Sequence, residues 1–82
     1  MNKEGFLYYD PSHDSYFLET GEKPIEIHDG DTIEYEISFR KIKATVSCYS
    51  HIWKLSKGRF NLESLAENQI PVTLIKSKEE SN

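Results

Sequence analysis

A chain of 82 residues with a net charge of −4 has room for one hydrophobic core, so we expect a single domain over residues 1–76 and a polar, disordered tail over 77–82. The apolar runs are too short to span a membrane, and the N-terminal residues lack the apolar segment of a signal peptide. The single cysteine, Cys48, excludes an internal disulfide. Together these features predict a cytoplasmic protein.

Two aromatic-rich runs, GFLYYD (5–10) and SYFLET (15–20), are separated by a turn that begins at Asp10-Pro11. They predict a β-hairpin, because both runs are rich in residues that favour strands. On one side of this hairpin we expect two facing pairs, Leu7 with Leu18 and Tyr9 with Tyr16. The aromatic side chains expected on the other side are Phe6, Tyr8 and Phe17.

The runs TIEYEIS (32–38) and KIKATVSC (41–48) alternate apolar and polar residues, which predicts two adjacent strands joined by a tight turn at Phe39-Arg40. Matching the apolar side chains predicts four cross-strand pairs: Ile37 with Ile42, Tyr35 with Ala44, Ile33 with Val46 and Glu36 with Lys43. Opposite charges facing each other across a sheet contribute about 0.2–1 kcal/mol per pair. The hydrophobic and charge patterns therefore favour the same register.

The remaining elements are short. Strands are expected at 25–27, at 51–55, which carries Trp53, and at 70–75. Asn61 is expected to cap a short helix over residues 61–68, whose apolar side is formed by Leu62, Leu65 and Ala66. Six or seven short strands with one short helix predict an all-β fold, either a small antiparallel SH3-like barrel or a strongly bent sheet.

Several short motifs resemble, in their order, a short uncharacterised bacterial family with the pattern YDxxxxRY…GDxxEV…W…GL…IPVG. They are Tyr8-Tyr9-Asp10, Tyr16-Phe17, Gly30-Asp31-Thr32-Ile33-Glu34, Trp53-Lys54-Leu55 and Ile70-Pro71-Val72. The sequence departs from this pattern at Ser38-Phe39-Arg40-Lys41, where the family has a glycine-containing turn, and at Ser56-Lys57-Gly58, where a glycine is displaced. The family occurs among phage, plasmid and conjugative-element genes and has no established activity, so the resemblance implies a mobile-element protein but no site residues.

Charge is divided unevenly along the chain, because residues 1–36 hold ten acidic side chains against two lysines, whereas residues 40–59 hold no acidic residue. The basic stretch 40–59 permits one hypothesis, a small β-barrel that binds single-stranded nucleic acid or RNA. The side chains that would contact nucleic acid are Lys41, Lys43, Lys54, Lys57, Arg59 and Tyr49, with Trp53 and Phe60 as further stacking residues. The competing interpretation pairs Lys41 and Lys43 with Glu34 and Glu36 across the hairpin and places Trp53 in the core.

No catalytic or cofactor motif is present, so we expect neither an enzyme nor a bound cofactor or metal. The segment His28-Asp29-Gly30-Asp31 has too few oxygen ligands for a calcium loop and predicts a turn with a left-handed glycine. Cys48 and His51 are a nucleophile and a base near each other in sequence, but Cys48 is expected to face inward. A catalytic pair at these two positions is therefore not expected.

The aromatic side of the first hairpin, Phe6, Tyr8 and Phe17, is the strongest candidate for an interaction surface. Either the helix or the last strand covers it, or it meets a protein partner or a second copy of the chain. Acidic residues would flank an uncovered surface, among them Asp10, Asp14 and Glu19. This combination favours a non-enzymatic module that binds a protein with a basic groove, such as a nucleic-acid-handling enzyme, as a mobile-element accessory or inhibitor.

Overall fold

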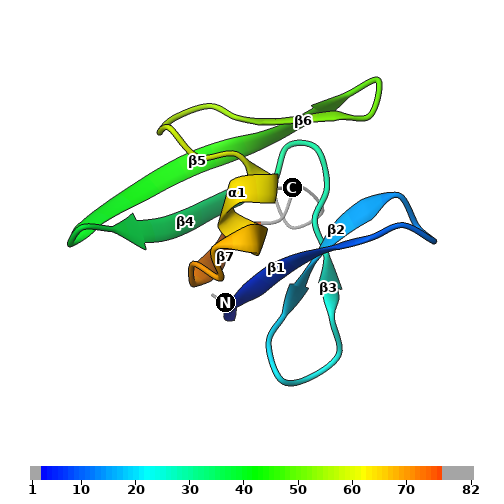
Figure 1. The fold of residues 1–82 in the computed structure, drawn as a ribbon, viewed down its shortest axis with the longest axis horizontal. Helices are drawn as coiled ribbons and strands as arrows, with labels where there is room; N and C mark the ends of the chain where they lie inside the picture. Colours follow the sequence, from blue (N-terminus) through cyan, green and yellow to red (C-terminus); the bar gives the residue numbers. More distant parts are fainter. Residues whose placement is uncertain (1–2, 77–82) are drawn as a thin grey trace.

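The computed structural model describes residues 3–76, and the tail predicted at 77–82 lies outside this range. The protein is a single antiparallel sheet with one short helix, as expected for an all-β fold (Figure 1). In chain order the elements are β1 (Lys3–Asp10), β2 (Ser15–Glu19), β3 (Ile25–Glu26), β4 (Thr32–Ile37), β5 (Arg40–Tyr49), β6 (Ile52–Leu55), α1 (Leu62–Glu67) and β7 (Val72–Lys76).

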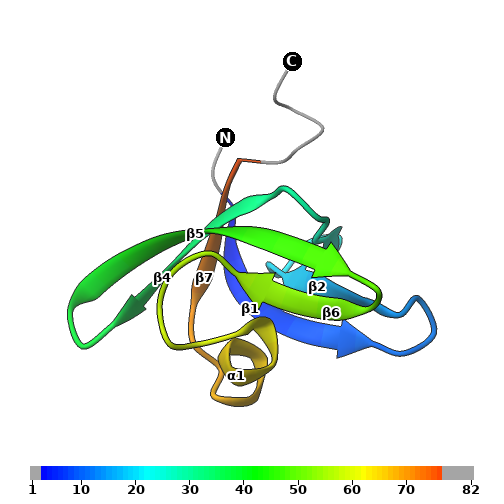
Figure 2. The same ribbon diagram turned by 90° about the horizontal axis from the view of Figure 1, so that it is seen from above.

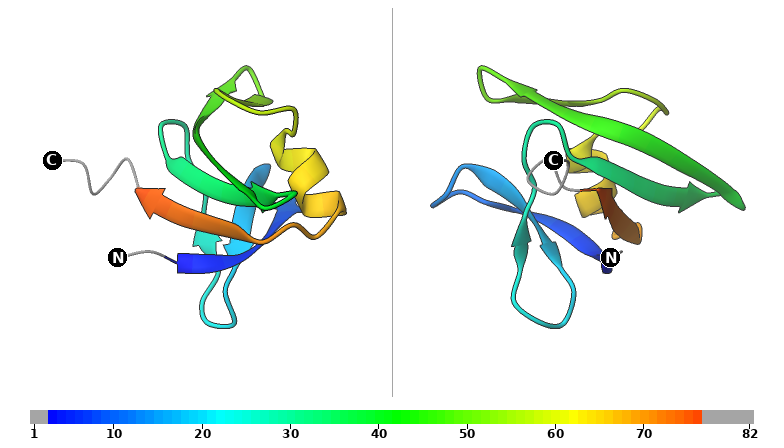
Figure 3. Two further views of the ribbon diagram at one scale, coloured as in Figure 1. Left: turned by 90° about the vertical axis from the view of Figure 1, so that its left-hand side faces the viewer. Right: turned by 180° about the vertical axis from the view of Figure 1, so that it is seen from behind.

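The sheet is strongly bent and, over the described residues, is not closed into a barrel. Its strand order is β3-β2-β1-β7-β4-β5-β6, with β7 inserted between β1 and β4. Strands β5 and β6 form one limb of the bend and β1, β2 and β3 form the other, with α1 between the two limbs (Figures 1 and 3). The bent-sheet prediction is therefore confirmed, whereas a closed SH3-like barrel is not formed.

The hydrophobic core lies inside the bend, and α1 closes it from one side. Asn61 caps the helix as predicted, because its side-chain oxygen accepts a hydrogen bond from the Ser64 backbone N–H at 2.7 Å. Leu62 and Leu65 are fully buried, so this two-turn helix is stabilised by docking on the sheet rather than by its own propensity. Other fully or almost fully buried side chains are Leu7, Leu18, Ile27, Ile33, Tyr35, Ala44, Val46 and Val72.

Hairpin β1–β2 has the predicted register. Leu7 lies opposite Leu18, and Tyr9 lies opposite Tyr16. Both leucines are buried on the side that faces α1, because the inward residues of the two strands coincide in this register. The alternation of the aromatic runs therefore predicted correctly which side of the hairpin enters the core.

The predicted register of β4 and β5 is wrong by two residues. Ile37 pairs with Arg40 rather than with Ile42, and the turn lies at Ser38 and Phe39, both of which have positive φ. A two-residue turn of this kind matches the twist of the strands, which the predicted four-residue connection would not do as well. A shift of two residues leaves every side chain on its original face, so the inward residues stay buried. The cross-strand charge pairs become Glu34 with Lys43 and Glu36 with Lys41.

The turn before β4 attaches the β2–β3 limb to β5. Gly30 has a φ of 96°, so the predicted left-handed glycine is confirmed. The Asp31 carboxylate is buried and accepts a hydrogen bond from the His28 backbone N–H at 2.8 Å. Asp29 accepts one from the Cys48 backbone N–H at 2.9 Å. These acidic side chains hold backbone groups in place, and no group of three or more potential metal ligands occurs among the described residues.

Within residues 3–76 there is no helix whose length and apolar character would allow it to cross a membrane.

Candidate functional site

The outward side of hairpin β1–β2 carries an uncovered aromatic surface. Phe6 is 47% exposed and Tyr8 is 36% exposed, while the Tyr8 and Phe17 rings stack with their centroids 5.8 Å apart. Helix α1 packs on the opposite side of the hairpin, against the cluster that contains Leu7. Neither α1 nor β7 therefore covers this surface, so the first of the two alternatives, cover by the helix or by the last strand, is wrong.

Acidic side chains surround these rings through the strand registers. Glu19 lies opposite Phe6, and Glu26 of β3 lies opposite Phe17. Glu4 is two residues before Phe6, so it projects from the same side of β1. We call this surface the hairpin face, and its residues are Glu4, Phe6, Tyr8, Phe17, Glu19 and Glu26.

Asp10 lies at the end of β1, beside the hairpin face. Its carboxylate accepts hydrogen bonds from the Ser12 hydroxyl at 2.7 Å and from the Ser12 backbone N–H at 2.9 Å, and it contacts His13 Nδ1 at 2.9 Å. These contacts, that of the Ser12 hydroxyl first and that of His13 next, lower the pKa of Asp10 below its ordinary value. The His13 ring also meets Phe17 edge-on at 5.4 Å, so the loop extends the surface with a fixed negative charge.

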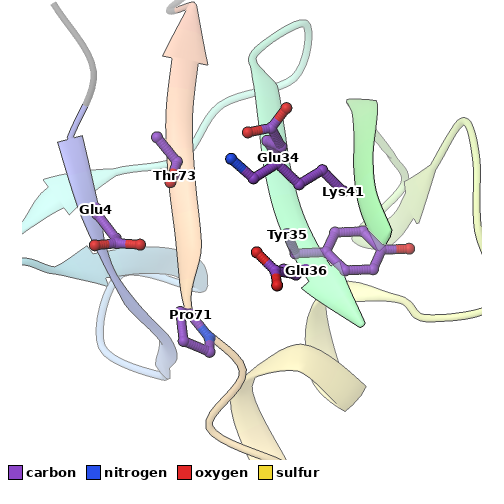
Figure 4. Close-up of a pocket in the computed structure, with 7 residues that line it drawn as sticks. All are labelled: Glu4, Glu34, Tyr35, Glu36, Lys41, Pro71 and Thr73. Carbon is purple, nitrogen blue, oxygen red and sulfur yellow. The ribbon is translucent and has the colours of Figure 1, made fainter. Parts of the chain in front are cut away.

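Negative charge continues from the hairpin face onto the outer side of the sheet (Figure 4). Thr73 of β7 lies between Glu4 of β1 and Glu34 of β4, since both pair with it across the strands. A shallow cavity of about 400 Å³ at this point is lined by these residues together with Glu36 and Lys41. Lys41 runs from β5 toward Glu34 in Figure 4, and Lys43 lies opposite Glu34 across the strands, so two lysines partly offset the three carboxylates.

Asp14, which was predicted beside the aromatic side chains, faces the other way. Its carboxylate accepts a hydrogen bond from the Tyr9 hydroxyl and lies 2.6 Å from Nδ1 of His51. Tyr9 belongs to the inward side of the hairpin, and His51 lies in the turn between β5 and β6. Asp14 therefore joins two hairpins and is not part of the hairpin face, whereas Asp10 and Glu19 lie where the prediction requires.

The residues of the basic stretch do not form one groove with Trp53. Lys43 and Lys41 lie opposite Glu34 and Glu36, as the competing interpretation requires. Lys54 and Tyr49 share the outer side of β5 and β6, and Tyr49 is 83% exposed. Two further cations of the candidate set, Lys57 and Arg59, are exposed in the loop that follows β6.

Trp53 projects from β6 toward the core, where it meets Tyr16 edge-on with a centroid distance of 5.5 Å. It is partly buried and packs against the core cluster, which agrees with its predicted place. Cys48 lies opposite Trp53 and is also partly buried. His51 contacts Asp14 rather than Cys48, so the two residues do not form a nucleophile and base pair.

The sequence did not reveal a cleft between α1, β6 and hairpin β1–β2. It has a volume of about 520 Å³, and its aromatic lining consists of Tyr8, Tyr9, Tyr16 and Trp53. Glu63 and Glu67 of α1 line it as well. Their spacing of four residues on a predicted helix was a visible signal, but only the bend of the sheet brings them to these aromatic residues.

Comparison of the chain with protein-family models, curated proteins and solved structures finds no match. The resemblance to the mobile-element family therefore stays a prediction, and the interpretation of the surface depends on its own chemistry.

Proposed function

We propose that this protein is a non-enzymatic binding module whose hairpin face docks onto a basic surface of another protein. The observation that supports the proposal most directly is the exposed stack of Tyr8 on Phe17, with Phe6 beside it, on a side of the sheet that no element of the described chain covers. Aromatic side chains in this position supply most of the binding energy in many protein interfaces.

The charge around these rings defines the kind of partner. Glu4, Glu19 and Glu26 surround the aromatic residues, and the Asp10 carboxylate adds negative charge at the end of β1. A frame of one sign accelerates association with a surface of the opposite sign and disfavours acidic partners. A protein groove that normally holds nucleic acid carries such a positive surface. An accessory or inhibitor role in a mobile element, exercised in the cytoplasm, is consistent with the predicted family and with the single cysteine.

The test uses capture from a nuclease-treated bacterial lysate followed by calorimetry with the purified captured protein. Tyr8→Ser should weaken binding at least tenfold, which corresponds to about 1.4 kcal/mol and is typical of a central aromatic residue. Phe39→Ser is the matched control, because Phe39 is 98% exposed at the far turn of β4–β5 and lies outside the hairpin face. Equal affinities of the two variants, or recovery that nuclease abolishes, would contradict the proposal.

A second candidate function is binding of single-stranded nucleic acid by the outer side of β5 and β6. It is favoured by one observation, the common side shared by Lys43, Lys54 and exposed Tyr49. The net charge of −4 and the glutamates opposite Lys41 and Lys43 oppose it. A salt-titrated gel shift with mixed oligonucleotides distinguishes the two, since salt-sensitive binding that is lost in a Lys54→Ala, Lys57→Ala double variant would favour this second function.

A further inference from the structure

The cleft beneath α1 lies on the opposite side of hairpin β1–β2 from the hairpin face. The residues that line it come from β1, β2, β6, α1 and the turns of hairpins β1–β2 and β5–β6. The tips of these two hairpins point in the same direction (Figure 2). The contact of His51 with Asp14 joins these two tips. The cleft is therefore built between elements that are held together, and its volume of about 520 Å³ exceeds that of a single large side chain.

Four aromatic side chains line this cleft, and three of them contact one another. Tyr9 meets Tyr16 edge-on with a centroid distance of 5.3 Å, and Tyr16 meets Trp53 edge-on at 5.5 Å. Tyr16 is buried beneath the other two, whereas Tyr9 and Trp53 keep part of their surface accessible. Aromatic faces carry negative potential, so a wall of this kind attracts a cation placed within about 6 Å of a ring centre.

Two carboxylates face the same cleft from α1. Glu63 and Glu67 are one helical turn apart, so both project from one side of the helix. Their charges reach the aromatic wall, since the pKa of the Tyr16 hydroxyl is raised first by burial and then by Glu63 and Glu67. Among residues 3–76, neither glutamate takes part in an ion pair or a side-chain hydrogen bond.

The cleft has no cation of its own to balance these glutamates. No lysine or arginine of the described chain lines it, and His51 at its rim is already in contact with Asp14. Exposed glutamates on a helix are usually only solvated, but here they line the same cavity as four aromatic rings. This combination of negative charge and aromatic surface is complementary to a flat organic cation.

We propose that the cleft binds the guanidinium group of an arginine side chain presented by a protein partner. A guanidinium stacks flat on an aromatic ring while its N–H groups donate to carboxylates, whereas a lysine ammonium is more strongly hydrated and lacks the planar face. In the proposed geometry the guanidinium plane lies against Tyr9 or Trp53 and donates to Glu63 and Glu67. Of the residues of the hairpin face, Tyr8 also lines this cleft, whereas Phe6, Phe17 and the three glutamates do not, so the two sites adjoin at Tyr8.

Trp53 is the only tryptophan of the chain, so its fluorescence reports directly on the cleft. The probe is the blocked tripeptide Gly-Arg-Gly, compared with peptides in which lysine or citrulline replaces the arginine. Citrulline keeps the shape and loses the charge. We expect a saturable change of Trp53 emission with the arginine peptide, at least a tenfold weaker response with citrulline, and an intermediate one with lysine.

Variants of the full chain locate the binding. The double variant Glu63→Gln, Glu67→Gln should weaken arginine-peptide binding about tenfold. The matched control Glu34→Gln, Glu36→Gln makes the same change in net charge on the outer sheet and should leave the affinity unchanged, as should Phe6→Ser on the hairpin face, since none of these residues lines the cleft. The proposal is overturned by equal binding of the citrulline peptide, by tighter binding of lysine, by equal losses in the two double variants, or by no response.

Discussion

Tyr16 and Trp53 touch edge-on with ring centroids 5.5 Å apart, although they belong to strands β2 and β6, near opposite ends of the sheet order. The contact exists only because the sheet bends through β7 and β4 and brings its two limbs face to face (Figure 1). Edge-to-face aromatic pairs add about 0.5–1.5 kcal/mol to the free energy gained by burial. This pair therefore stabilises the bent form of the sheet, in which the cleft is formed.

Replacing Trp53 by alanine should lower the free energy of unfolding by about 2–3 kcal/mol, below the range for fully buried tryptophan because Trp53 is only partly buried. The midpoint of urea unfolding, followed by far-UV circular dichroism, measures the effect. Tyr49→Ala removes an aromatic residue that is 83% exposed on the other side of the same hairpin and should change stability by less than about 0.5 kcal/mol. Equal losses in the two variants would mean that the limbs are not held by this contact.

Gly58 is required by both its backbone and its surroundings. Its φ is 89°, and a Cβ atom placed there would overlap the Tyr35 hydroxyl and come within 3.2 Å of Tyr35 Cζ. Tyr35 is almost fully buried and donates a hydrogen bond to the Lys57 carbonyl oxygen at 3.5 Å, so it has no room to move away. We expect Gly58→Ala to lower the free energy of unfolding by about 2–4 kcal/mol, from overpacking together with backbone strain.

Substitution of Gly21 distinguishes the effect of backbone strain from that of overpacking. Its φ of 91° is nearly the same as that of Gly58, but a Cβ atom there would meet nothing within 4 Å. Gly21→Ala should therefore lower the free energy of unfolding by only about 1 kcal/mol, the effect of strain alone. Chemical denaturation of both variants measures the difference, and a loss in Gly58→Ala no larger than that in Gly21→Ala would show that the contact with Tyr35 is unimportant.

The sequence predicted the faces of the strands well because alternation is a local property. Leu7 and Leu18 are buried together, and Phe6 and Tyr8 lie outside, as their positions in the two runs indicated. The helix cap at Asn61 was predictable for the same reason, since a cap needs only the next three residues. The sequence could not, however, indicate whether another element covers the outer side.

Two features depended on interactions that no local pattern contains. The register of β4–β5 was missed because Ser38 and Phe39 are poor candidates for left-handed backbone, and a shift by two residues preserves both the apolar and the charge alternation. The cleft was missed because α1 meets Tyr16 and Trp53 only after β7 has inserted between β1 and β4. Both errors concern the way elements are joined, not the elements themselves.

The turn at Ser38 and Phe39 offers a stabilising substitution. Both residues have positive φ, and Phe39 is 98% exposed, so its side chain gains nothing from burial. Replacing the pair by Asn-Gly, which suits a two-residue turn with positive φ at both positions, should raise the free energy of unfolding by about 1 kcal/mol. Thermal unfolding measures the gain, and no gain would argue against a left-handed turn at these residues.

Ser50 and His51 form the equivalent turn of β5–β6, again with positive φ at both residues. Here Asn-Gly removes the contact of His51 with Asp14 at 2.6 Å. The increase in the free energy of unfolding should therefore be smaller than at Ser38 and Phe39, although the same backbone strain is removed. Equal gains at the two turns would show that the His51 contact contributes nothing to stability.

The carboxyl group of Asp14 gives the link between the two hairpin tips a pH dependence. Its pKa is lowered from 3.8, first by the hydrogen bond from the Tyr9 hydroxyl and then by the charge and hydrogen bond of His51. A pKa that is lower in the folded state than in the unfolded state contributes stability above pH 3.8, and this contribution is lost as the pH falls through the folded value. The stability difference between the native chain and Asp14→Asn should therefore shrink in acid.

Tyr9→Phe tests the cause of this shift, because it removes the largest contribution and leaves the ring in place. In a carbon-13 NMR titration of the carboxyl groups, the pKa of Asp14 should move up toward its ordinary value. The pKa of Asp10 in the same loop is lowered by Ser12 and His13, not by Tyr9, so it serves as an internal control and should not change. If the pKa of Asp14 also stayed unchanged, the Tyr9 hydroxyl would not be its hydrogen-bond donor in solution.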